Sequence, residues 1–484
     1  MKKEVILVFP GKSSIRPQLP LSCLFLAKTL EKKGYTPKII DMRLEDYNLL
    51  DLKIDDVICV GISTMTSPMI LHGIEFAKQV RDVSPHTPIV WGGIHPSLLP
   101  NQTILNDYVD IVVRGEGELT LLELVQKLES EESLENVKGI TYKENGTIKA
   151  NPDREWMNLN EIGTLPYHLI DMNKYNITEF TYQSSRGCPY NCGFCYNRAF
   201  NKKSYRFKSS ENVLKDLEYI VNKFNLKQIN FDDDNFFVHR KRVEEICRGI
   251  LERNFNIDWY ATCRINYFAK YNSEFINLLK DSGCKKILFG AESGSTNILK
   301  SIDKDIEVEE TISAVKKCKE AGIIPILSFM CGFSNETRED VDKTLDFIDK
   351  IKEIYDKVLI NGLFLFTPFP NTPLANKLRE MGYQPPPNLE EWGKILYGHV
   401  TNQPWFGKKY LDELITISDI VRFRYFNEFG FSSRLKSEFH ILPYLIFNYL
   451  FLISARIRWK YKYFRFPIEW KVWSYIRIRY LEHT

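Results

Sequence analysis

Three cysteines in one short loop constrain this chain more than any other feature. Cys188, Cys192 and Cys195 have C-x3-C-x2-C spacing, and the loop is rich in turn-forming residues. This spacing lets the thiolates converge on one point, which predicts a metal site. A structural zinc site takes four protein ligands, and no fourth cysteine or histidine lies at a comparable spacing nearby. Three ligands with an open fourth position suit a [4Fe-4S] cluster in which one iron holds something else. Three unrelated buried cysteines would not explain the glycines and proline, which core strands avoid.

The loop resembles the cluster motif of the radical S-adenosylmethionine (SAM) enzymes. In that family the open iron chelates the amino and carboxylate groups of SAM, and an electron from the cluster releases a 5′-deoxyadenosyl radical. The radical abstracts hydrogen from an unactivated carbon. Phe194, just before the last cysteine, fits the family pattern of an aromatic ring beside the cluster and the adenine. The resemblance implies a [4Fe-4S] cluster and SAM, with a reducing electron donor such as flavodoxin or ferredoxin.

Length, charge and cysteine usage narrow the class of protein further. A chain of 484 residues can bury two sizeable cores. A formal net charge of +3 is too small to indicate that the protein as a whole binds nucleic acid. Ten cysteines, three of them in the loop, do not form a disulfide framework. The apolar run Val5–Phe9 is too short for a signal peptide and predicts a first strand. We therefore expect a reducing, cytoplasmic location.

Short apolar runs alternate with helical ones between residue 4 and about residue 125. Continuous apolar strands joined by amphipathic helices predict an α/β domain with a doubly wound parallel sheet, which binds ligands at the carboxyl ends of its strands. The expected strands are Val5–Phe9, Pro37–Asp41, Val57–Ser63, Pro88–Trp91 and Ile111–Val113. Glycines follow three of them, so we expect a rim where backbone closely approaches a large ligand.

This layout resembles the cobalamin-binding, Rossmann-like domain of one radical SAM subclass, which includes the anaerobic magnesium-protoporphyrin ester cyclases, hopanoid methylases and C-methyltransferases. The resemblance implies cobalamin contacts at Gly61, Ser63, Gly92, Gly93, Gly115 and Glu116. The Asp-x-His-x-x-Gly motif that supplies a cobalt-ligating histidine in some cobalamin domains is missing after the first strand. We therefore expect cobalamin without a histidine ligand to cobalt, the alternative being a domain that has lost the cofactor. His72 and His95 are both less suited to bind cobalt than to serve in turns.

The chain as a whole divides into four parts. Residues 1–135 form the cobalamin-binding-like domain, residues 136–180 a connector with a hairpin, and residues 181–375 a second run of alternating strands and helices. Six β/α units with polar or glycine residues at the strand ends predict a partial (β/α)6 barrel with its site on that face, and this matches the radical SAM barrel. Residues 376–484 form a helical C-terminal region.

Residues at the barrel strand ends are assigned by what SAM needs. Asp233 and Asp234 follow the second strand and would accept hydrogen bonds from the SAM ammonium group. Arg264, after the third strand, would pair with the SAM carboxylate or a substrate acid through its planar fork. The other expected contacts are Glu292 and Ser293 for the ribose and Gly332 for close approach of the adenine. Solvated turns or salt bridges inside the barrel are the competing interpretation.

The C-terminal region combines an apolar run, His440–Ile453, with basic and aromatic residues as far as Arg479. The run is too short to span a bilayer. Aromatic residues with arginine and lysine suit a helix in the headgroup plane, so we expect peripheral contact through residues 440–480 with the inner face of the membrane. A hydrophobic cap over the substrate entrance and an RNA-binding tail are the alternatives.

The leading interpretation is a cobalamin-dependent radical SAM C-methyltransferase that acts on an unactivated carbon of an apolar, lipid or tetrapyrrole-like substrate. A rival in the same family performs cyclisation, coupling or oxygen insertion without net methyl transfer. A rival from another class is a non-catalytic cluster and cobalamin sensor. The complete set of polar strand-end residues argues against the sensor, which has no need of a SAM site.

Overall fold

The computed structural model describes residues 3–12, 14, 16–44, 54–395, 403–426, 442–465, 469 and 472. The chain forms two compact units. The first contains the chain up to Ala261, Asp281–Gly283 and the segment from Pro368 to Leu396; the second contains Thr262–Lys280, Cys284–Thr367 and the segment from Tyr397. Each unit is described by itself.

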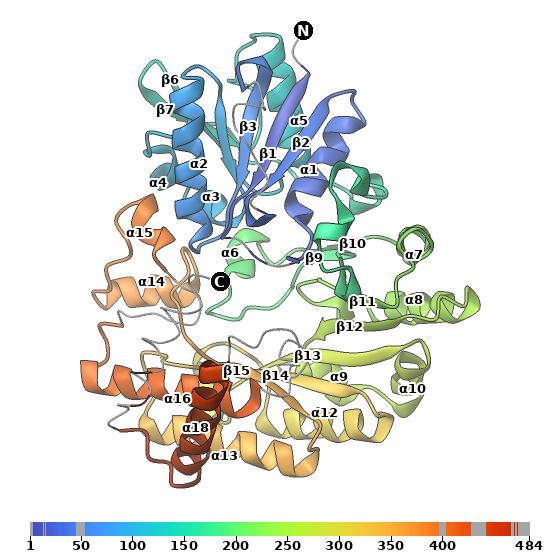
Figure 1. The fold of residues 1–484 in the computed structure, drawn as a ribbon, viewed down its shortest axis with the longest axis vertical. Coiled ribbons are helices and arrows are strands. Elements are labelled where there is room, and N and C mark those ends of the chain that lie inside the picture. The colour runs from blue at the N-terminus through green and yellow to red at the C-terminus, as the bar shows by residue number, and fades with distance from the viewer. Residues whose placement is uncertain are drawn as a thin grey trace. The chain divides into compact units, whose positions relative to one another are not determined.

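A seven-stranded sheet with the order β2-β1-β3-β4-β5-β6-β7 begins the first unit (Figure 1). Its first five strands are parallel. These strands are β1 (Glu4–Phe9), β2 (Thr36–Asp41), β3 (Val57–Ser63), β4 (Ile89–Gly92) and β5 (Ile111–Val113). The expected strands and the parallel sheet are therefore confirmed.

The expected hairpin, β6 (Ile140–Glu144) and β7 (Thr147–Ala150), pairs antiparallel with β5. The sheet thus continues beyond residue 135, where we expected the domain to end, because β6 covers the polar edge of β5.

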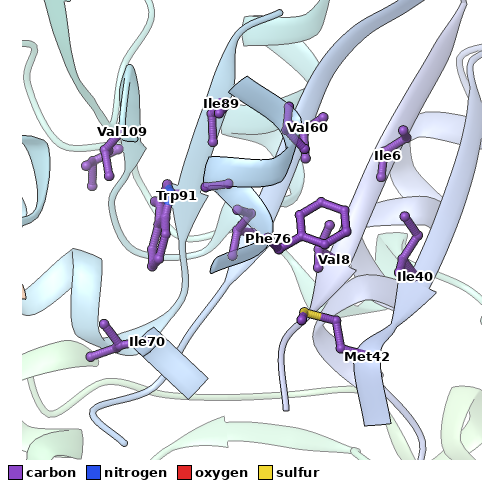
Figure 2. Close-up of a cluster of buried hydrophobic side chains, with 14 of the residues drawn as sticks. Ile6, Val8, Ile40, Met42, Val60, Ile70, Phe76, Ile89, Trp91 and Val109 are labelled. Carbon is purple, nitrogen blue, oxygen red and sulfur yellow. The ribbon is translucent and has the colours of Figure 1, made fainter. Parts of the chain in front are cut away.

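Helices cover both faces of this sheet, because successive side chains of a strand point to opposite faces. Ile6 and Val8 join a cluster with Phe76 and Trp91 (Figure 2). Val5 and Leu7 join a second cluster on the opposite face. The helices are α1 (Leu21–Glu31), α2 (Met69–Val83), α3 (Ile94–Leu98), α4 (Pro100–Ile104), α5 (Gly117–Glu129), α14 (Pro373–Glu380) and α15 (Leu389–Gly393). The strands' carboxyl ends are left open to form a site.

The first unit also contains the beginning of the second β/α run. Strands β8 (Phe180–Tyr182), β11 (Gln228–Phe231) and β12 (Asp258–Cys263) run parallel, with β11 between the other two. The small ribbon of β9 (Ser185–Gly187) and β10 (Tyr205–Phe207) carries the cysteine loop. The helices are α6 (Tyr196–Phe200), α7 (Ser210–Phe224) and α8 (Arg240–Glu252). Ser209 caps α7 by accepting from the Asn212 N–H.

The second unit contains three further parallel strands, with β14 between the other two. They are β13 (Cys284–Glu292), β14 (Ile324–Cys331) and β15 (Leu359–Leu365). The helices are α9 (Ile265–Lys270), α10 (Ser273–Asp281), α11 (Thr296–Ser301), α12 (Val308–Ala321), α13 (Arg338–Ile354), α16 (Lys408–Phe426) and α18 (Leu442–Lys460). The six expected strands are thus present, and the described part of the C-terminal region is helical.

Candidate active site

The cysteine loop follows β9 and is held in a fixed turn. Gly187, at φ +87°, permits the approach of β10, because a Cβ there would overlap the carbonyl oxygen of Ser204. The Cys195 N–H donates to the Cys192 carbonyl at 3.2 Å, and the Leu374 N–H donates to the Gly193 carbonyl at 2.9 Å. The loop therefore depends on glycine and on backbone contacts, as its composition predicts.

The three cysteines have the chemistry of cluster ligands. Cys192 is buried, and Cys188 and Cys195 are half-buried. Burial is the largest cause that raises the pKa of Cys195 to about 12, and the neighbouring Cys192, Asp234 and Cys188 contribute in the same direction. A thiolate in this loop needs a cation beside it, which cluster iron would supply. Within the described residues, no three His, Cys, Asp or Glu side chains converge on a single-ion site, and the role of the three cysteines as cluster ligands stays a prediction. Phe194 is half-buried in the loop, and its adenine contact stays a prediction.

Asp233 has a different role from the one expected. Its carboxylate accepts from the N–H groups of Ser184 (2.6 Å) and Ser185 (3.0 Å) and from both serine hydroxyls (2.6 and 2.7 Å). Four hydrogen bonds leave little capacity for a SAM ammonium group, so the assignment of Asp233 is corrected. It instead holds the segment that leads into the cysteine loop.

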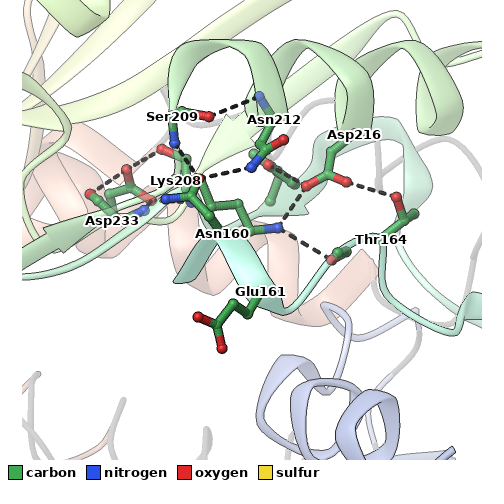
Figure 3. A network of polar contacts seen from close by, with 12 residues as sticks. Asn160, Glu161, Thr164, Lys208, Ser209, Asn212, Asp216 and Asp233 are labelled. Atoms are coloured by element: carbon green, nitrogen blue, oxygen red, sulfur yellow. Dashed lines mark hydrogen bonds and ion pairs between the residues drawn. The ribbon is translucent and has the colours of Figure 1, made fainter. Parts of the chain in front are cut away.

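A buried polar network supports that segment from behind (Figure 3). The Lys208 N–H donates to the Ser184 carbonyl at 2.9 Å, and the Lys208 ammonium pairs with Asp216 at 2.6 Å. Asp216 also accepts from the hydroxyls of Thr164 and Tyr182, both at 2.8 Å. A fully partnered buried network of this kind fixes one arrangement of the chain.

Asp232 and Asp234 are better placed than Asp233 to meet a ligand, because both line a cavity in the first unit. Asp234 also accepts from the Gly187 N–H at 2.7 Å. Burial raises the pKa of Asp232 to about 6, with smaller contributions from Asp233 and Asp234. Asp232 is a candidate ligand residue that our sequence reasoning missed.

This cavity has a volume of about 480 Å³ and a largely apolar lining. It lies at the carboxyl ends of β1, β3, β4 and β5, and it also reaches the segment around the cysteine loop through Arg186 and Tyr196. The lining includes all six residues expected to contact cobalamin: Gly61, Ser63, Gly92, Gly93, Gly115 and Glu116. Gly93, at φ +96°, leaves room that a Cβ would fill against the Thr64 backbone. A glycine-rim cavity with an apolar lining fits a corrin.

None of the lining residues that the structure describes is a histidine. His95 is fully buried beside the cavity wall, with its Nδ1 2.9 Å from the Thr66 hydroxyl. This arrangement agrees with cobalamin held without a histidine ligand.

Glu116 does more than line the cavity, since it accepts a hydrogen bond from Arg206 and forms an ion pair with Arg186. It lies 3.1 Å from Arg186 and 2.6 Å from Arg206, and Arg186 also pairs with Glu118 at 2.7 Å. Arg186 stands two residues before Cys188, and its guanidinium covers the Phe25 ring at 4.5 Å. Burial disfavours the guanidinium charge, but Glu118 and Glu116 outweigh it and hold the pKa of Arg186 above its usual value. We call Arg186, Glu116, Glu118 and Arg206 the arginine bridge; it joins the cavity rim to the cysteine loop.

The SAM residues expected in the second unit lie at strand ends, and they have close protein partners. Glu292 has φ +60° and pairs with Lys304 at 2.6 Å, with both side chains buried. Such a conformation is rare outside glycine, asparagine and aspartate. Ser293 shares a hydrogen bond with Thr344 at 3.0 Å, and Arg264 is buried before α9. Lys304 was missed, because nothing near it in the sequence marks it as a partner of Glu292.

Gly332 permits close approach, but of a protein side chain. It has φ +87°, and a Cβ there would lie 3.0 Å from the Gln403 Oε1. The Trp405 indole N–H donates to the Gly332 carbonyl at 3.2 Å. Contact with adenine at this glycine stays a prediction.

Comparisons with known proteins agree with this geometry. The chain matches the Radical SAM superfamily model over residues 182–348 and the B12 binding domain model over residues 18–125. An uncharacterized methyltransferase of Pyrococcus horikoshii is 34% identical over 77% of this chain and 82% of its own length. The anaerobic magnesium-protoporphyrin IX monomethyl ester cyclase of Rubrivivax gelatinosus is 26% identical over 74% of this chain and 66% of its own length.

Two solved structures share the fold. The cobalamin-dependent SAM radical enzyme OxsB superposes with a TM-score of 0.68 at 23% identity, over 78% of this chain and 61% of its own. The radical SAM methyltransferase TsrM from Kitasatospora setae superposes with a TM-score of 0.66 at 19% identity, over 79% of this chain and 75% of its own.

The chain is therefore a radical SAM enzyme. More particularly, it belongs to the group of that superfamily that carries an N-terminal B12-binding domain. The expected family, fold class and enzymatic nature are confirmed, and the sensor interpretation is set aside.

His95 provides a test of the packing beside the cavity. Burial lowers its pKa from 6.5 to about 4, so between these values the unfolded chain binds a proton that the folded chain does not. Stability contributed by neutral His95 is present above pH 6.5 and is lost as the pH falls toward 4. We expect this loss, about 3 kcal/mol, to disappear in His95→Gln when urea unfolding is followed across this range. The exposed His86→Gln is the matched control and should keep the wild-type pH dependence; equal profiles for wild type and His95→Gln would contradict the prediction.

Proposed function

We propose that this enzyme is a cobalamin-dependent C-methyltransferase that acts on an unactivated carbon of an apolar substrate. One observation carries the proposal: a single cavity within the first unit is lined both by the glycine rim of the B12-binding domain and by the segment around the cysteine loop. The rim would hold a corrin, and the same cavity reaches the segment that would hold SAM. The relative named as an uncharacterized methyltransferase supports the same reaction class.

The cofactors supply the chemistry, and the chain supplies position and environment. When bound, the cluster supplies the electron, SAM the 5′-deoxyadenosyl radical and cobalamin the transferred methyl group. Cys188, Cys192 and Cys195 would hold the cluster. Asp232 and Asp234 present carboxylates to the cavity and would accept from the SAM ammonium group.

Other residues orient these groups and exclude water. Glu292, Ser293, Arg264 and Gly332 remain the proposed SAM contacts from the second unit. The apolar residues of the cavity would exclude water from the corrin and from the reacting groups. They include Leu7, Phe9, Leu19, Phe25, Val90 and Val113.

An apolar substrate and a peripheral position on the inner face of the membrane are the finer parts of this proposal. No helix that the structure describes is long and apolar enough to cross a membrane. The support is α18, which leaves Leu450 and Ile457 more than half exposed. A reductant such as ferredoxin or flavodoxin would complete the system.

The reaction class is tested with the full chain, reconstituted anaerobically with iron, sulfide and hydroxocobalamin and then given SAM, a chemical reductant and candidate lipids or tetrapyrroles. We expect the protein to retain corrin through gel filtration and to form both 5′-deoxyadenosine and S-adenosylhomocysteine. S-adenosylhomocysteine reports methyl transfer. Formation of 5′-deoxyadenosine without it, on a substrate that is converted, would favour the cyclase class to which the 26% identical relative belongs.

A further inference from the structure

Helix α18 is apolar on two opposite faces, of which only one is covered. Phe451, Leu452, Ala455 and Trp459 are at most 9% exposed, and this face packs against α16. Four large residues project elsewhere: Leu450 (56% exposed), Ile453 (39%), Ile457 (54%) and Tyr461 (69%). Steps of three or four residues place them on one side of the helix. We call these four residues the exposed stripe.

A continuous apolar stripe of this kind needs a partner. Single exposed apolar residues are ordinary on a protein surface, but contiguous ones mark protein or membrane contacts. Tyr463 (49% exposed) lies just beyond the end of α18 and extends the apolar surface. The buried face already provides the packing that holds α18 in the second unit, so the stripe is not needed for the fold.

Charge next to the stripe identifies the kind of partner. With about 100° per residue, Arg456 and Lys460 lie between the stripe and the buried face, along one border of the stripe. Both are exposed. Together with Lys352, Arg424 and Tyr425 they line a second cavity, of about 460 Å³, whose described lining contains no acidic residue.

The acidic residues near this cavity are already paired. Asp349 accepts from Arg424 at 3.3 Å and from the Trp459 indole N–H at 2.8 Å. Glu469, which follows α18 in the sequence, pairs with Arg458 of that helix. Asp349 compensates the charge of Arg424, so the positive potential of the cavity comes chiefly from the exposed Arg456 and Lys460. An anion of phosphate size fits this chemistry.

We propose that the exposed stripe and the adjoining cation-lined cavity form a docking surface for an anionic lipid bilayer. The apolar side chains enter the headgroup layer, Tyr461 lies at its polar boundary, and lipid phosphates contact Arg456 and Lys460. An apolar face bordered by arginine and lysine is what an interfacial helix requires. This proposal identifies the surface that would bind the membrane in the proposed function. It depends on the proposed membrane position and not on the proposed reaction.

The test is co-sedimentation of the full-length, cofactor-loaded protein with vesicles of phosphatidylcholine, with and without phosphatidylglycerol. We expect binding to the anionic vesicles only, weakening as salt is raised. Arg456→Gln/Lys460→Gln should weaken binding about fivefold for each charge removed, and Ile457→Ser should weaken it without changing its salt dependence. The matched control, Lys300→Gln/Lys316→Gln, removes two exposed lysines from α11 and α12 and should bind almost as the wild type does.

Three outcomes would overturn the proposal: equal binding to both vesicle types, equal binding of the wild type and the Arg456/Lys460 variant, or a dimer that Ile457→Ser converts to a monomer, which would make the stripe a contact between copies. Corrin and cluster absorbance would show that each variant is folded. Formation of 5′-deoxyadenosine without vesicles should be unchanged in all variants, so failure of docking and failure of the proposed chemistry are distinguishable.

Discussion

Cys192→Ala should abolish formation of 5′-deoxyadenosine, with a loss of at least about a thousandfold, because the electron that cleaves SAM comes from the cluster. Cys192 is the most buried cysteine of the loop, and its carbonyl also accepts from the Cys195 N–H. Alanine keeps that backbone contact and removes only the thiolate. The measurement is iron content and product formation after anaerobic reconstitution.

Corrin retention separates loss of the cluster from loss of the fold. The cavity lining does not include Cys192, so the variant should still retain hydroxocobalamin through gel filtration. Cys247→Ala is the matched control, because it removes one buried thiol from α8, away from the loop, and it should keep both cofactors. A Cys192→Ala variant that still forms 5′-deoxyadenosine would contradict the assignment of the loop as the cluster site.

The strands of the first domain and the glycine rim at their carboxyl ends could be predicted from the local sequence pattern. Apolar runs of three to seven residues with glycine near their carboxyl ends fix where parallel strands stop, and those ends meet at one edge of a sheet. For this reason the rim residues from Gly61 to Glu116 were expected at one site, and all line the same cavity. The cysteine loop was equally predictable, since its ligands lie within eight residues of one another.

Contacts between distant segments could not be predicted. Arg186 and Glu118 are 68 residues apart, and the sequence of each shows only an isolated charge near a glycine. The acidic run after β11 shows a second limit. Neighbouring side chains there point in different directions, so composition identified the run but did not distinguish Asp233, which holds the loop, from Asp232, which lines the cavity.

Arg186→Leu should destabilise the first unit by about 3–5 kcal/mol, because it leaves Glu118 buried and without its arginine. Glu118 is 4% exposed, and α5 begins at Gly117. The helix N-terminus favours a carboxylate there, but that effect is smaller than the cost of an unpaired buried charge. Urea unfolding of the apoprotein, followed by tryptophan fluorescence, measures the change.

A double variant and an exposed ion pair, used as a control, test whether loss of the arginine bridge causes the loss of stability. Arg186→Leu/Glu118→Leu should recover much of the stability, because no unpaired carboxylate remains at residue 118, and the cycle gives the coupling between the two side chains. Lys202→Leu breaks an ion pair with Asp153 whose side chains are 64% and 58% exposed, and it should cost less than about 1 kcal/mol. If Arg186→Leu costs no more than Lys202→Leu, the bridge does not hold the cavity rim to the cysteine loop. If it costs the expected amount, hydroxocobalamin should also bind the variant more weakly, since Arg186, Glu116 and Glu118 all line the cavity that we propose holds the corrin.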